Sequence, residues 1–144
     1  MSKPITGAEL LRARMVDVPA QGMAQMLGMD VAHVGEGEVT LTAVPSRAFY
    51  NLMGVVHGGF AATLLDSACG LAAVAATREP SRCLTLEIKV AYHAALTEAT
   101  GMVTVTGKVL KIGRRTAFTE ARLEDAAGKL YASATSTLLI EPEA

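Results

Sequence analysis

Alternating apolar and polar positions dominate the second half of the chain. The clearest alternation lies in residues 84–92, where every second residue is apolar or aromatic. A two-residue period is typical of a strand with one buried face. The same period predicts further strands over residues 102–112, 115–124 and 129–140. Within the first of these, Gly107 predicts a bulge or bend.

The first third of the chain combines weak helical signals with a second region of alternation. Residues 6–28 have the spacing of short helices, broken at Pro19 and ended by Gly28 as a C-cap. Residues 29–44 return to the two-residue period and contain a glycine-rich turn at residues 35–37. This region therefore predicts two strands joined as a hairpin.

Between the two regions of alternation, residues 57–77 are apolar over a length that could span a membrane. The stretch nevertheless contains His57, Asp66 and several glycines, and most of its apolar residues are small alanines. We interpret it as the buried helix of a soluble fold. We expect it to end by about Arg78, because Pro80 disfavours helical geometry in the residue before it.

The order of these elements predicts the fold class. Consecutive strands without intervening helices pair antiparallel, because parallel pairing needs long crossover connections. A helix that is apolar on nearly all sides must also be covered on nearly all sides, and a strongly curved sheet covers it by wrapping around it. We therefore expect one α+β domain over residues 1–144, with about five or six strands around a long central helix and residues 1–28 as a helical extension.

Composition adds an expectation of self-association. The 144 residues, 51% of them hydrophobic and 19% charged, exclude intrinsic disorder and fit a single core. The mean hydropathy of +0.34 is on the apolar side for a soluble protein. Some of the apolar surface is therefore expected in a subunit interface, as a homodimer or a dimer of dimers whose strands join edge to edge.

Charge and cysteine content exclude several classes of partner. Thirteen basic and fourteen acidic residues give a net charge of −1, so nothing favours nucleic acid or a membrane surface. Cys69 and Cys83 are too few for a disulfide framework, and the N-terminus lacks the apolar run of a signal peptide, so we expect a cytoplasmic protein. His33, His57 and His93 lack metal-ligand spacing, and we assign no metal.

The start of the long helix carries the unusual residues. Gly58 and Gly59 each cost about 1 kcal/mol relative to alanine in a helix interior. They either expose backbone N–H groups to an oxyanion or carbonyl oxygen, or permit close packing against a strand. Asp66 follows two turns later among apolar residues, where it is either a general base or a hydrogen-bonded structural residue.

These motifs resemble the signature of the PaaI-type hotdog-fold thioesterases. The matching parts are Asn51, the run His57-Gly58-Gly59, and the run Thr63-Leu64-Leu65-Asp66. The resemblance covers about residues 29–140 and leaves residues 1–28 outside. A hotdog fold agrees with the order of elements described above.

The resemblance implies a role for each matching residue. The Gly58 N–H would bind the thioester carbonyl oxygen, with Asn51 assisting and His57 shaping the loop. Asp66 from the opposite subunit would activate water or act as the nucleophile. Thr85 occupies the strand position where some relatives place a serine that orients this water.

The resemblance also implies a substrate. The protein would hydrolyse a medium-chain or aryl acyl-CoA to the free acid and CoA, with no separate cofactor. A basic turn between two predicted strands would hold the phosphates of coenzyme A; otherwise the turn is a solvated hairpin tip. Its residues are Lys111, Gly113, Arg114 and Arg115.

Two alternatives belong to other functional classes. A hotdog hydratase or dehydratase needs an acid–base pair that moves a proton on carbon, and no histidine closely follows Asp66. A non-catalytic acyl-CoA-binding protein would bind the ligand without turnover. The leader of residues 1–28 is short and not basic, which argues against an attached DNA-reading domain.

Overall fold

The computed structural model describes residues 3–17 and 21–143. The helices in this part of the chain are α1 (Gly7–Asp17), α2 (Gly22–Met26) and α3 (Gly58–Ala75), with short 3-10 turns η1 (Arg47–Phe49) and η2 (Glu98–Thr100). The strands are β1 (Asp30–Gly35), β2 (Glu38–Ala43), β3 (Ser81–Tyr92), β4 (Val103–Ile112), β5 (Thr116–Asp125) and β6 (Leu130–Pro142). The predicted helix break at Pro19 lies outside the described residues.

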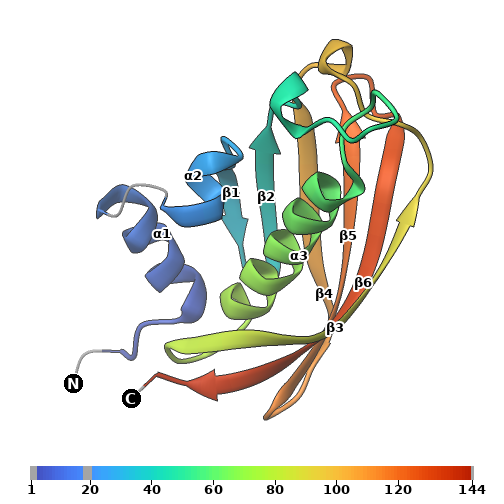
Figure 1. Cartoon of the computed structure of the whole chain (residues 1–144). Helices are drawn as coiled ribbons and strands as arrows, with labels where there is room; N and C mark the ends of the chain where they lie inside the picture. The colour runs from blue at the N-terminus through green and yellow to red at the C-terminus, as the bar shows by residue number, and fades with distance from the viewer. Residues whose placement is uncertain (1–2, 18–20, 144) are drawn as a thin grey trace.

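The strands form one antiparallel sheet that curves around α3 (Figure 1). The 6-stranded order is β1-β2-β4-β5-β6-β3, so β1 and β3 are the two edges. Helices α1 and α2 lie beside β1 (Figure 1). The predicted α+β architecture, a long helix wrapped by an antiparallel sheet, is confirmed.

Helix α3 supplies the centre of the core. Its side chains Leu64, Leu65 and Ala68 are all 0% exposed and pack against the inner face of the sheet. The helix is long and apolar enough to cross a membrane, yet 50% of it is buried inside this fold, as expected of a core helix. It ends at Ala75, in agreement with the expected end by about Arg78, and in the following turn the Thr77 hydroxyl donates to the Val74 carbonyl oxygen at 2.7 Å.

Of the bulge or bend predicted at Gly107, the bulge is absent. Gly107 pairs in regular register with both neighbouring strands, and the irregularity of β4 lies further on, between Val109 and Lys111. A Cβ atom at Gly107 would collide with the backbone carbonyl group of Ala68. The glycine therefore allows α3 to pass close over β4, a reason for glycine in a strand that the period of a sequence does not reveal.

Candidate active site

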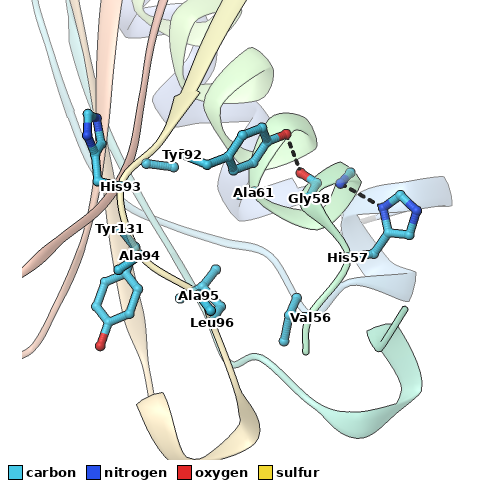
Figure 2. Close-up of a pocket in the computed structure, with 12 residues that line it drawn as sticks. Val56, His57, Gly58, Ala61, Tyr92, His93, Ala94, Ala95, Leu96 and Tyr131 are labelled. Atoms are coloured by element: carbon cyan, nitrogen blue, oxygen red, sulfur yellow. Dashed lines mark hydrogen bonds between the residues drawn. The ribbon is translucent and has the colours of Figure 1, made fainter. Parts of the chain in front are cut away.

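The first turn of α3 borders a cavity of about 550 Å³ (Figure 2). His57 caps this helix, because its Nδ1 accepts a hydrogen bond from the Gly59 N–H at 2.9 Å. None of the described residues accepts a hydrogen bond from the N–H of Gly58. This group therefore remains available, at the positive end of the helix dipole, to bind a ligand oxygen.

Tyr92, at the end of β3, is a feature of this cavity that sequence reasoning missed. Its hydroxyl donates to the Gly58 carbonyl oxygen at 2.8 Å, and Figure 2 shows it on the opposite side of Gly58 from His57. A Cβ atom at Gly58 would lie 3.0 Å from Tyr92 Cζ. The glycine thus permits close packing against β3 and also leaves its N–H group without an acceptor among the described residues.

Asp66 and Thr85 meet elsewhere, between the middle of α3 and the edge strand β3. The Thr85 hydroxyl donates to Asp66 Oδ1 at 2.7 Å, and both residues line a second cavity of about 570 Å³. Asp66 is half-buried. Its other oxygen, Oδ2, has no hydrogen-bond donor among the described residues. The carboxylate is therefore held in place by one bond and keeps an oxygen able to accept a proton from water.

A β-bulge determines which side chain of β3 faces Asp66. The register of β3 against β6 shifts between Thr85 and Glu87. With a strict two-residue period both side chains would point to the same face. The bulge instead turns Glu87 outward, where its carboxylate accepts from the Thr137 hydroxyl at 2.7 Å. A second carboxylate is thereby kept away from the Asp66–Thr85 pair.

The Gly58 N–H and the Asp66 carboxylate of one chain are too far apart to act on the same thioester. At the helical rise of about 1.5 Å per residue, the distance between them along α3 is about 12 Å. The two cavities also share no lining residue. One chain therefore holds two separate groups at different cavities, the Gly58 N–H in one and the Asp66 carboxylate in the other.

The histidine and cysteine side chains offer no competing chemistry at Asp66. His57 and His93 line the other cavity, and none of the three histidines lines that of Asp66. Cys83 does line it, but burial raises the pKa of its thiol to about 11, so the group is protonated at neutral pH and is a poor nucleophile. Within residues 3–17 and 21–143, no group of three or more His, Cys, Asp or Glu could hold a metal ion.

Asn51 organises the loop that precedes α3. Its side-chain oxygen accepts from the backbone N–H of Met53 at 2.8 Å and of Val55 at 3.4 Å. Asn51 is not among the residues that line the Gly58 cavity of its own chain. Its amide NH₂ is the part of the side chain left for a ligand.

Comparison with known proteins identifies the family. A family model described as the thioesterase superfamily matches residues 53–132, more than half of the chain. The chain belongs to the thioesterase superfamily. The matched region includes Gly58, Asp66 and Thr85, whereas Asn51 and helices α1 and α2 lie outside it.

Individual relatives agree with this assignment. The chain is 25% identical over 120 residues to a 1,4-dihydroxy-2-naphthoyl-CoA hydrolase of Listeria monocytogenes, covering 83% of this chain and 96% of that protein. A thioesterase family protein from Silicibacter pomeroyi superposes with a TM-score of 0.82 and 27% identity, over 95% of this chain and 99% of that one. A mutant of phenylacetic acid degradation protein PaaI from Thermus thermophilus superposes with a TM-score of 0.72 and 30% identity, over 81% of this chain and 96% of that one. The hotdog fold expected from the sequence is confirmed.

In this member of the superfamily, the basic turn lies at the end of α3 opposite to Gly58. The 18 residues of α3 span about 27 Å, and the turn joins β4 to β5. Gly113 and Arg114 line a cavity of about 490 Å³ near the C-terminal end of α3, together with Arg78. Arg115 is exposed on the same turn, whereas Lys111 is exposed near the end of β4 rather than on the turn. Sequence reasoning missed Arg78, because only the folded chain brings it beside Arg114.

Proposed function

We propose that the protein hydrolyses the thioester of a medium-chain or aryl acyl-CoA to a free acid and CoA, as a cytoplasmic PaaI-type thioesterase. The observation that carries the proposal is the Asp66–Thr85 hydrogen bond of 2.7 Å in a cavity with largely apolar walls. The similarity to a protein named as a CoA hydrolase supports a CoA thioester as the substrate. No additional cofactor is required.

The complete site forms between two copies of the chain. Strand β3 is a sheet edge, with hydrogen-bonding groups able to pair with another strand. It carries Thr85 beside Asp66 and, near its other end, Tyr92 beside Gly58. Antiparallel pairing of two β3 edges about a twofold axis brings the Thr85 end of one strand toward the Tyr92 end of the other. The Gly58 N–H of one chain and the Asp66 carboxylate of the other, each a half-site, thereby complete each other in a homodimer, which a dimer of dimers would contain twice.

Each half-site then has a separate task in hydrolysis. The N–H of Gly58 binds the carbonyl oxygen and stabilises the negative charge that develops on it, with Asn51 assisting and His57 fixing the turn. Asp66 of the partner subunit removes a proton from water, and the water oxygen attacks the carbonyl carbon. As the C–S bond breaks, CoA leaves as the thiolate and takes up that proton, which restores the Asp66 carboxylate. The Thr85 hydroxyl donates a hydrogen bond to Asp66, so its oxygen lone pairs can accept a hydrogen bond from that water and orient it.

The first test separates hydrolysis from the alternatives. Incubation with a panel of straight-chain and aryl acyl-CoAs, to which an enoyl-CoA is added, is expected to release free thiol and free acid in equal amounts. A hydratase would instead consume an enoyl-CoA without releasing thiol, and a binding protein would retain the acyl-CoA intact. The absence of thiol release across the panel would contradict the proposed function.

The basic turn provides a further prediction. If Arg114 and Arg115 contact the phosphates of CoA, replacing both by alanine should raise KM by about tenfold and leave kcat nearly unchanged, because these contacts are equally strong in the ground and transition states. Steady-state kinetics at constant ionic strength measure both constants. Arg122→Ala is a matched control, since Arg122 pairs with Glu124 at 3.1 Å on β5, away from the turn. Equal KM values in all three proteins would place the nucleotide elsewhere.

A further inference from the structure

Part of the wall of the cavity beside Asp66 is formed by the N-terminal segment, residues 3–17 and 21–35, which lies outside the region that the family model matches. We call this cavity the front cavity. Its polar end holds Asp66, Thr85 and Ser67. Toward α1, α2 and β1 the lining becomes apolar, apart from Asp30, and includes Met15, Ala24, Met29, Val31, Leu71 and Val74. An acyl group whose carbonyl carbon lies near Asp66 would therefore extend its tail toward the N-terminal segment.

A smaller cavity of about 220 Å³ adjoins the front cavity, and we call it the rear cavity. Apart from Arg14, its lining is entirely apolar and comes from α1, β1, β2 and α3. Three side chains line both cavities: Met15, Val31 and Leu71. These three residues form a partition between the catalytic carboxylate and additional apolar space.

Helix α1 is held firmly enough to keep this partition in place. A Cβ atom at Gly7 would collide with the carbonyl oxygen of Val74, so glycine permits α1 to approach the end of α3 closely. The Gly7 N–H donates to the Thr77 carbonyl oxygen at 3.0 Å. The Arg12 guanidinium donates to the Val34 carbonyl oxygen of β1 at 2.8 Å. The helix is thus fixed to both elements that contribute the other partition residues.

We infer that the partition of Met15, Val31 and Leu71 limits the length of the acyl group that the protein accepts. This inference rests on the proposed function and adds a specificity-determining residue outside the matched family region. Val31 and Leu71 belong to the sheet and to the central helix, whereas Met15 closes the partition from α1 and is 41% exposed. Met15 is therefore the member that can be shortened with the least disturbance of the core.

The Met15→Ala variant tests the inference, because it shortens the side chain that closes the partition from α1. Straight-chain acyl-CoAs from acetyl- to palmitoyl-CoA serve as probes, and kcat/KM is measured for each. The ratio of kcat/KM for acyl groups beyond the wild-type limit to that for groups within it is expected to rise on the order of tenfold, because additional methylenes gain apolar contacts. Met26→Ala is the matched control, since Met26 lies in the same segment, is 77% exposed and lines neither cavity.

A binding measurement separates this inference from the proposed function. In an Asp66→Asn background, the Kd of each acyl-CoA is measured by calorimetry with and without Met15→Ala. A shift of the Kd profile toward longer chains supports the length limit even if no acyl-CoA is hydrolysed. Hydrolysis that depends on Asp66, combined with length profiles that Met15→Ala leaves unchanged in both assays, would overturn the length limit and retain the function.

Discussion

Replacing Asp66 by asparagine should lower kcat for acyl-CoA hydrolysis by roughly 10²- to 10⁴-fold and leave KM nearly unchanged. Asparagine keeps the size of the side chain and a carbonyl oxygen that can accept the bond from Thr85, which measures 2.7 Å in the native protein. It removes only the basic oxygen that takes a proton from water. Steady-state kinetics on the best acyl-CoA of the panel measure the effect.

The same variant distinguishes a catalytic Asp66 from a structural one. Light scattering and thermal unfolding show whether Asp66→Asn remains assembled and folded. A folded, oligomeric variant that hydrolyses its best substrate at the wild-type rate would leave Asp66 as a structural residue.

The Thr85→Ala variant, which removes only the orienting hydroxyl, should lower kcat about tenfold in the same kinetic assay. Thr85→Ser retains a hydroxyl and should recover most of that loss.

The main elements of the fold could be predicted because their signals are local. The alternation of residues 84–92 and the length of the apolar stretch around Asp66 identify a strand and the central helix without knowledge of tertiary structure. The sequence pattern failed where a tertiary contact determines which residue a position can hold. Gly107 is a glycine because the backbone of Ala68 lies against it, and the two residues meet only when α3 crosses β4.

The residues of the candidate site likewise include some that the sequence indicates and others that only tertiary contacts reveal. Gly58 and Asp66 could be selected from the sequence because adjacent glycines and a carboxylate are unusual in an apolar helix. Thr85 was indicated only by the resemblance. The two-residue period alone places Thr85 and Glu87 on the same face and cannot choose between them, because the bulge that turns Glu87 away from Asp66 leaves no sign in the sequence pattern. Tyr92 and Met15 were missed because β3 and α1 bring them to α3 from distant parts of the chain.

Replacing Gly58 by proline should remove the proposed oxyanion donor and lower kcat by roughly 10²- to 10³-fold. Proline has no backbone N–H and is well tolerated at the first position of a helix. His57 already has φ −57° and ψ 135°, a conformation that suits a residue before proline. Gly58→Ala is the matched control for crowding, because it keeps the N–H but places a Cβ 3.0 Å from Tyr92 Cζ. Loss of kcat in the proline variant alone would assign the effect to the N–H.

Mixing the two inactive variants tests whether each site uses two chains. A heterodimer of Asp66→Asn and Gly58→Pro chains has one site with both substitutions and one site with neither. Random assortment makes about half of the dimers heterodimers, so about one quarter of wild-type activity should return. Co-expression with two different affinity tags allows the heterodimer to be purified and its activity measured directly. If both half-sites acted within one chain, every site would carry one substitution, and a purified heterodimer would show only the residual activity of its parents.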